Sequence, residues 1–202
     1  MSAAQPVLNI AGNALDETSI AKLQSGLRGP VLRQEDSGYD EARAVWNGMI
    51  DKRPGLIAQC TGAADVMTAV RFARQHDLLV AIKGGGHNVA GSAVCDGGLV
   101  IDLSEMNAVH VDPVGRTARV EPGVRLGGVD HETQAFGLAV PAGIVTTTGV
   151  AGLTLGGGFG WLSPKLGLTC DNLISADIIT AEGEMITASE ERNADVFWGI
   201  KG

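Results

Sequence analysis

Three consecutive glycines followed by histidine and asparagine, at residues 84–88, form the pattern with the most chemical potential in this sequence. An imidazole can act as a nucleophile, a proton carrier or a metal ligand. Consecutive glycines let successive backbone N–H groups bind one anion, such as a phosphate, without interference from side chains. A tight crossover between packed strands also uses glycine, so these five residues alone leave both interpretations open.

Glycine is concentrated in two places. The 202 residues include 29 glycines, of which six lie in residues 84–98 and seven in residues 143–160. The overall frequency is about twice the usual value of roughly 7%. Such clusters indicate a backbone in unusual conformations, or a backbone that a ligand must approach closely.

The two common nucleotide-binding glycine motifs are absent from the sequence. A P-loop requires a Gly-Lys pair, and the chain has none. The stretch GGGFGW supplies Gly156, Gly158 and Gly160, but Trp161 follows and no convincing strand precedes it. The Rossmann fingerprint needs that strand, so neither standard motif is predicted.

The remaining histidines do not suggest a metal site. His76, His110 and His131 fall in no recognised ligand spacing. The acidic residues that flank His131 cannot share its face of a helix, because adjacent helical residues point in different directions. We therefore predict no metal.

The composition narrows the classes of partner and compartment. A net charge of −8 without a basic cluster disfavours nucleic acid. Cys60, Cys95 and Cys170 are odd in number and far apart, which predicts reduced core thiols. Residues 133–164 carry no charge, but their glycines, proline and threonines predict a buried loop with a short helix, not a membrane span. The N-terminus shows no export signal, so we expect a cytoplasmic protein.

The elements that must position the first glycine cluster can be predicted from periodicity. Residues 15–27 have helical spacing, and residues 55–60 form an apolar strand. Residues 61–79 predict a helix with Thr61 as its N-cap, and residues 80–84 predict the next strand. Together these residues predict a β-α-β unit with parallel strands.

Further along the chain the hydrophobic period changes to that of antiparallel pairs. Residues 108–120 and 175–189 each alternate around a turn and predict β-hairpins. Residues 124–136 predict a weak helix. The chain is thus expected to begin as a small α/β lobe and to continue as an α+β lobe.

Five long stretches together resemble one known family. The sequence is similar to the FAD-linked oxidases of the vanillyl-alcohol-oxidase superfamily (PCMH-type FAD-binding), and it is most similar to the berberine bridge enzyme-like branch. The resemblance covers about residues 55–202 in the family's order. It rests on GGGHN at 84–88, GGLVIDLSEMN at 97–107, VEPGVRLGGV at 120–129, the run from PAGIVTTTGV to AEGE at 141–184, and NADVFWGIKG at 193–202.

The resemblance implies an α+β, PCMH-type FAD-binding domain of two lobes over residues 51–202. Residues 1–50 are expected to form an N-terminal helical lead-in. Relatives continue into a substrate domain and a C-terminal return that completes the flavin domain, and neither is found in these 202 residues.

The resemblance also implies the cofactor site. His87 corresponds to the histidine that is bonded to the 8α-methyl group of FAD. The expected phosphate nest consists of Gly84, Gly85, Gly86, Asn88 and Gly91. The residues expected to line the flavin and its diphosphate are Thr148, Gly149, Gly152, Gly158, Phe159 and Gly160. Ile178 is expected near the adenine.

Two positions differ from, or refine, the family pattern. Many relatives attach the flavin through a second bond from a cysteine, and that position is Val145 here, so a single bond through His87 is expected. Thr148 is compact, which favours oxygen access and therefore an oxidase. No catalytic base is identified, although His131, Glu132 and Tyr39 are available.

The resemblance implies an FAD-dependent oxidoreductase that takes a hydride from a small-molecule carbon bearing oxygen or nitrogen and passes the electrons to O2. Two alternatives stay open. The chain could be a truncated flavin- or ligand-binding module without turnover, which would expose apolar surface and self-associate. It could also be the flavin subunit of a multi-subunit oxidoreductase.

Overall fold

The computed structural model describes residues 7–202. The chain divides into two compact units. Unit 1 comprises Met1–Glu105 with Ile179–Met185, and unit 2 comprises Met106–Ile178 with Ile186–Gly202. The predicted domain boundary at residue 50 stays a prediction, and residues 7–50 belong to unit 1.

Unit 1 is built on a four-stranded sheet with the order β1-β2-β4-β3. The strands β2 (Leu56–Gln59) and β3 (Val80–Lys83) both pair in parallel with β4 (Leu99–Asp102), and β1 (Val31–Leu32) adds an antiparallel edge. Every residue of β4 is buried because strands flank it on both sides and helices cover the sheet. The predicted parallel β-α-β unit is confirmed, with β4 placed between its two strands.

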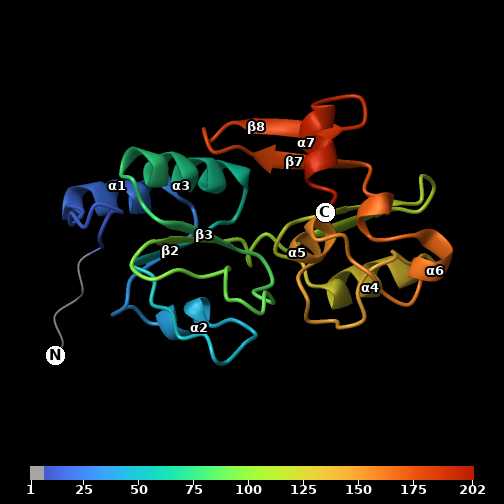
Figure 1. Cartoon of the computed structure of the whole chain (residues 1–202), viewed down its shortest axis with the longest axis horizontal. Coiled ribbons are helices and arrows are strands. Elements are labelled where there is room, and N and C mark those ends of the chain that lie inside the picture. Colours follow the sequence, from blue (N-terminus) through green and yellow to red (C-terminus); the bar gives the residue numbers. More distant parts are fainter. Residues whose placement is uncertain (1–6) are drawn as a thin grey trace. The chain divides into compact units, whose positions relative to one another are not determined.

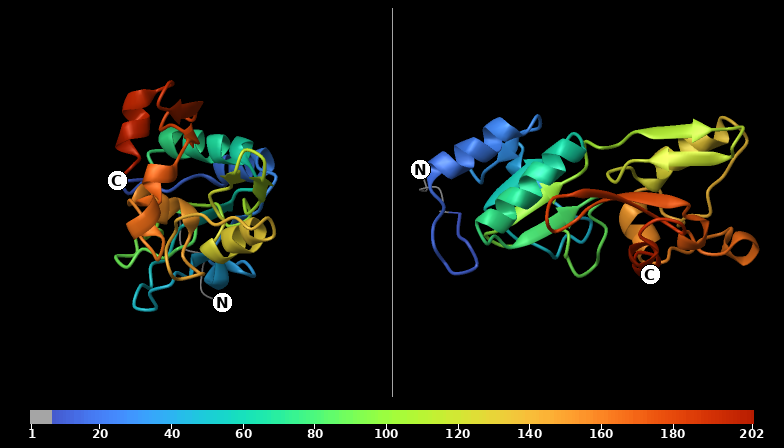
Figure 2. Two further views of the ribbon diagram at one scale, coloured as in Figure 1. Left: turned by 90° about the vertical axis from the view of Figure 1, so that its right-hand side faces the viewer. Right: turned by 90° about the horizontal axis from the view of Figure 1, so that it is seen from above.

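Three helices cover this sheet. The helices α1 (Glu17–Gly26) and α3 (Ala63–Gln75) contact each other and lie side by side on one face (Figures 1 and 2). The short helix α2 (Tyr39–Arg43) lies on the other face and contacts β2 (Figure 1). Residues 7–50 thus contain α1, the edge strand β1 and α2, and the lead-in predicted for residues 1–50 stays a prediction.

The start of α3 differs from the prediction. Gly62, not Thr61, occupies the N-cap position. Asp65 in the first helical turn is buried, and it accepts hydrogen bonds from the Thr61 N–H and hydroxyl group, both at 2.9 Å, and from the Arg28 N–H at 3.1 Å. Thr61 is thus a donor to a buried carboxylate, because that carboxylate needs partners once it leaves water.

Unit 2 contains the second glycine cluster. The strands β5 (Val109–Asp112) and β6 (Thr117–Val120) form the predicted hairpin, with Val109 opposite Val120. The strands β7 (Ser175–Ile179) and β8 (Met185–Ser189) form the second one, whose turn belongs to unit 1. The helical elements of this half are α4 (Leu126–Gln134), α5 (Val150–Leu155), α6 (Ser163–Leu166), the 3₁₀ helix η1 (Cys170–Asn172) and α7 (Ala194–Gly199).

The three cysteines are free and buried, as predicted. Burial raises the pKa of the Cys60 thiol to about 12, with a further contribution from the charges of Asp65 and Asp102, so this thiol stays protonated. No helix in residues 7–202 has the length and hydropathy needed to cross a membrane.

Candidate functional site

The first glycine loop, residues 84–91, begins directly after β3 in unit 1. Its glycines are needed for conformation as well as for space. Gly86 has φ +65° and Gly91 has φ +71°, both in the left-handed region that favours glycine. A side chain on Gly91 would also overlap Ile50, since an added Cβ atom would lie 2.8 Å from two of its carbons.

A segment of unit 1, residues 45–52, runs along this loop, and we call it the strap. The Trp46 N–H donates to the Gly86 carbonyl at 3.0 Å, and the Asn47 side-chain amide donates to the Val89 carbonyl at 2.8 Å. Farther along, the Lys52 ammonium donates to the Gly91 carbonyl at 3.0 Å. The strap therefore binds carbonyl oxygens of the loop and does not use the N–H groups of Gly84, Gly85 and Gly86.

His87 lies half-buried in this loop, and its ring is stacked on that of Trp46. The two ring centres are 4.7 Å apart and the ring planes differ by 25°. Asn88 turns the chain away from the histidine, because its side-chain oxygen accepts from the Ser92 N–H and its carbonyl accepts from the Gly91 N–H, both at 3.1 Å. The imidazole thus sits on a loop whose course is fixed on both sides.

The origin of the loop is fixed by a buried ion pair. The Lys83 ammonium, in the last residue of β3, lies 3.5 Å from a carboxylate oxygen of Asp102, which is only 1% exposed. The same ammonium donates to the Ala42 carbonyl at 2.5 Å. A buried carboxylate is costly without a partner, so this contact secures the position from which Gly84 starts.

The second glycine loop, residues 148–160, lies in unit 2 and contains α5. Two hydrogen bonds fix its beginning: the Leu126 N–H donates to the Thr148 carbonyl, and the Val150 N–H donates to the Val124 carbonyl, both at 2.9 Å. Gly149 is the N-cap of α5, and Gly152 lies in that helix, where an added Cβ atom would meet nothing within 4 Å.

At the end of the second loop, the backbone packs closely against neighbouring residues of unit 2. A Cβ atom on Gly160 would overlap the Ala142 carbonyl oxygen, and one on Gly158 would overlap the Thr169 hydroxyl oxygen. The Thr169 N–H donates to the Gly158 carbonyl at 2.9 Å. Within residues 7–202 the buried Thr169 hydroxyl has no hydrogen-bond partner, although a buried hydroxyl normally finds one. Phe159, between these glycines, is 74% exposed.

The three residues that the sequence offers as a catalytic base, His131, Glu132 and Tyr39, lie outside both glycine loops. His131 and Glu132 are adjacent in α4 and contact each other at 3.0 Å, and both side chains are exposed. Tyr39 is buried in the core of unit 1, where its hydroxyl donates to the Pro54 carbonyl at 2.7 Å. Burial raises the pKa of this phenol. Tyr39 is therefore a structural residue.

The structure thus distributes the predicted site residues over two regions. Six of them lie in the first glycine loop of unit 1, and the remainder lie in unit 2, where Ile178 is half-buried in β7. Sequence reasoning did not identify Trp46 and Asn47, because they lie in an irregular segment with no hydrophobic period. Within residues 7–202 no cluster of three or more His, Cys, Asp and Glu residues could hold a metal ion.

Each loop, taken by itself, has features that fit part of a dinucleotide-like cofactor. The first loop offers glycine N–H groups that the strap does not use, beside an imidazole that is stacked on Trp46. The second loop excludes side chains at Gly158 and Gly160 and lies against an unpaired buried hydroxyl. Phosphates bind to such backbone donors, and a flavin ring needs a backbone that it can approach closely.

The family model described as "FAD binding domain" matches residues 54–189, which is more than half of the chain. The chain therefore belongs to the FAD-binding domain family. Within that family its relatives are 6-hydroxynicotine oxidase and berberine bridge enzyme-like oxidases, so it is a member of the vanillyl-alcohol-oxidase superfamily with the PCMH-type fold. This confirms the predicted family and the predicted fold class.

One curated relative and two solved structures illustrate the similarity. The chain is 41% identical to (R)-6-hydroxynicotine oxidase of Paenarthrobacter nicotinovorans over 176 residues, which is 87% of this chain and 38% of the relative. The crystal structure of 6-hydroxy-D-nicotine oxidase from Arthrobacter nicotinovorans matches 87% of this chain and 39% of that one, with a TM-score of 0.85 and 41% identity. The berberine bridge enzyme-like protein 1 of Physcomitrella patens matches 91% of this chain and 40% of that one, with a TM-score of 0.85 and 31% identity.

The 202 residues thus span about two fifths of the length of these relatives. The matched part is the FAD-binding part, and the relatives are FAD-linked oxidoreductases.

Proposed function

We propose that this chain is the FAD-binding portion of an oxidase that holds its flavin by one covalent bond, through His87. When bound, the flavin supplies hydride acceptance from a substrate carbon and electron transfer to O2. The observation that carries the proposal is the half-buried His87 imidazole, which is stacked on an indole and lies within a glycine loop whose carbonyls are bound by the strap.

The chain's own groups have separate tasks in this proposal. The N–H groups of Gly84, Gly85 and Gly86 bind the diphosphate, because successive glycine amides can converge on one anion. His87 supplies the nucleophilic nitrogen. The second loop lines the flavin with backbone, and the exposed Phe159 ring offers an apolar contact. Val145 stands where many relatives carry a second attaching cysteine, so no second bond forms.

The relatives indicate the reaction class. One is named for the oxidation of 6-hydroxynicotine and another is a chitooligosaccharide oxidase, so the substrates in their names carry oxidisable carbons next to nitrogen or oxygen. We infer the same class for the complete protein, namely a small molecule oxidised at a C–N or C–O carbon, with Thr148 permitting access of O2.

A second function follows from the length of the match. The chain spans about two fifths of its relatives, and its exposed His131–Glu132 pair lies outside both glycine loops. In this second function, these 202 residues bind flavin without turnover, or serve as the flavin subunit beside another polypeptide. Turnover by the purified chain with O2 as the only acceptor would exclude this function.

The covalent bond can be tested directly. The protein is produced with ample FAD, denatured, freed of small molecules and examined by visible absorption and in-gel fluorescence. We expect yellow colour that remains with the wild-type chain and with His110→Ala, whose histidine is exposed in β5, and that is lost in His87→Ala. Colour released from the wild type on denaturation would overturn the covalent bond but keep flavin binding. A colourless protein that FAD cannot reconstitute would overturn both.

A further inference from the structure

Trp46 is an exposed aromatic residue in an unusual position. Its side chain is 61% exposed, yet its ring is stacked on His87, with 4.7 Å between the ring centres. Its backbone N–H also donates to the carbonyl of Gly86, the residue before the histidine, at 3.0 Å. The backbone and the ring of one residue thus contact both the chain leading to His87 and the imidazole itself.

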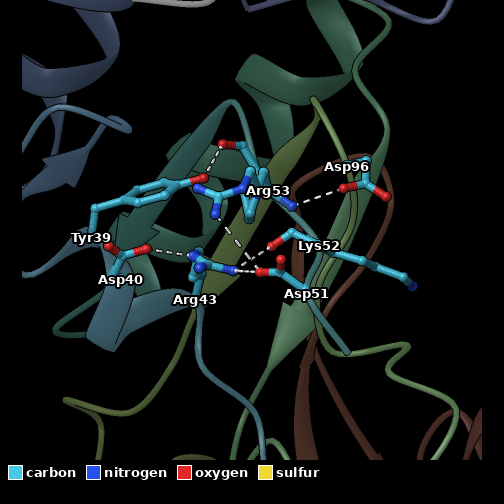
Figure 3. Close-up of polar contacts among 8 residues, drawn as sticks. Tyr39, Asp40, Arg43, Asp51, Lys52, Arg53 and Asp96 are labelled. Carbon is cyan, nitrogen blue, oxygen red and sulfur yellow. Dashed lines mark hydrogen bonds and ion pairs between the residues drawn. The ribbon is translucent and has the colours of Figure 1, made fainter. Parts of the chain in front are cut away.

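The strap that carries Trp46 is anchored at its other end by charged groups (Figure 3). The Arg43 guanidinium binds the Asp51 carboxylate at 2.5 Å and the Lys52 carbonyl at 3.3 Å. The next residue, Arg53, donates its N–H to the Asp96 carboxylate at 2.8 Å. The strap is thus bound both here and along the loop, so the backbone that carries the Trp46 indole is held on both sides.

The stack restricts the plane of the imidazole ring. The two ring planes lie within 25° of each other, and aromatic pairs at such distances favour offset stacked arrangements. The lone pair of an imidazole nitrogen lies in the plane of its ring. The orientation of the indole therefore sets the plane in which His87 can attack a carbon atom.

We propose that Trp46 is a positioning residue that orients the His87 imidazole for bond formation with the flavin. This inference rests on the proposed function. In that step a nitrogen–carbon bond forms between His87 and the 8α-carbon, while one proton leaves the methyl group and another leaves the imidazole. The two electrons of the broken C–H bond reduce the flavin, and O2 then accepts them with two protons as hydrogen peroxide.

The test compares rates of covalent incorporation after addition of FAD to flavin-free protein. Trp46→Leu keeps an apolar side chain without the flat ring, Trp46→Phe restores a ring, and Trp198→Leu changes an exposed tryptophan of α7 as the control. We expect Trp46→Leu to slow incorporation about 10- to 100-fold, as small errors of orientation do. The Phe variant should remain within about threefold of the wild type, as should the control.

A second readout needs no flavin. In the flavin-free chain the ring current of Trp46 should shift the NMR signals of the His87 ring protons upfield. We expect Trp46→Leu to abolish this shift, Trp46→Phe to retain part of it and Trp198→Leu to leave it unchanged. Circular dichroism of each variant confirms that the fold is intact.

The outcomes separate this inference from the proposed function. If the wild type forms the bond and Trp46→Leu forms it at the same rate, the positioning role is wrong and the covalent site stands. Equal loss of rate in the Leu and Phe variants also overturns the role, since a planar ring should suffice. If wild-type protein holds FAD without a bond, the covalent attachment fails and this role fails with it.

Discussion

Two buried carboxylates in unit 1 are stabilised by different partners. Asp102 is paired with the Lys83 ammonium, whereas Asp65 depends on hydrogen bonds from Thr61 and Arg28. Burial by itself raises the pKa of Asp65, but these hydrogen bonds, together with one from the Gly29 N–H, outweigh burial and leave the pKa below its usual value. The ionised form of Asp65 is therefore part of the folded structure.

Asp65 should make stability depend on pH in the acidic range. A carboxyl group whose pKa is lowered by folding contributes stability above its unfolded pKa of about 3.9, and this contribution is lost as the pH falls through the lower folded pKa. We expect Asp65→Asn to lower the free energy of unfolding at pH 7 by about 1 to 3 kcal/mol. Urea denaturation at pH 7 and at acidic pH measures the effect of the substitution on the free energy of unfolding and how that effect depends on pH.

The control is Asp130→Asn, which changes an exposed carboxylate in α4. It should change stability by less than about 0.5 kcal/mol. The difference between Asp65→Asn and the wild type should shrink as the pH falls below about 4. A difference that is the same at both pH values would contradict the role of the ionised Asp65.

The two glycine loops are shaped by different constraints. The first loop is held by donors from the strap, and its glycines at 86 and 91 adopt left-handed conformations. In the second loop, Gly160 is required by close backbone approach, whereas Gly152 faces open space. A glycine without protein neighbours in a helix has no packing reason to lack a side chain. Ligand contact is the reason that the proposed function supplies.

Alanine substitutions in the second loop should separate these roles. Gly160→Ala forces a Cβ atom against the Ala142 carbonyl and should destabilise the fold by about 1 to 3 kcal/mol. Gly152→Ala should preserve or slightly raise stability, since alanine favours a helix by up to about 1 kcal/mol over glycine. Urea midpoints measure both effects.

Gly152→Ala should nevertheless weaken FAD binding about tenfold or more if this helix face lines the cofactor, because a methyl group then takes space that the ligand needs. Fluorescence titration with FAD gives the affinity. Gly199→Ala in α7, another position with open space around it, serves as the control and should keep full affinity. Unchanged affinity in Gly152→Ala would remove this residue from the site.

The local hydrophobic pattern of the sequence predicted individual strands and hairpins better than it predicted which elements contact one another. Hydrophobic alternation located both hairpins and the strand that leads into His87. The insertion of β4 between β2 and β3 could not be read from the sequence, because long-range pairing leaves no local period. For the same reason Trp46 was missed: its stacking partner is distant in sequence. The predicted Thr61 cap of α3 is wrong because the Thr61 hydroxyl donates to the buried Asp65 carboxylate, a contact that depends on burial and leaves no local signal in the sequence.

At the scale of the whole molecule, the chain exposes several large apolar side chains in unit 2. Trp161 and Trp198 are 83% and 82% exposed, and Phe159 and Ile174 are also largely exposed. Isolated exposed apolar residues are ordinary, but several large ones within one unit favour association. The chain spans about two fifths of the length of its relatives.

The isolated 202-residue chain should therefore self-associate weakly. Sedimentation velocity should show a mean size that grows with concentration, and Trp198→Ser should weaken association about tenfold, as expected for the loss of one buried aromatic contact. Trp46→Ser, which changes an exposed tryptophan of unit 1, is the matched control and should associate like the wild type. A monomer at all concentrations, with tightly held flavin, would contradict this expectation.

The stack between Trp46 and His87 has an optical consequence. Indole emission overlaps the absorption of oxidised flavin, and energy passes efficiently between two such groups when they are within a few nanometres. A flavin bonded to His87 would be attached to the residue whose ring lies 4.7 Å from that of Trp46. The indole is thus positioned as an intrinsic energy donor, and its emission would decrease as the site becomes filled, without any added label.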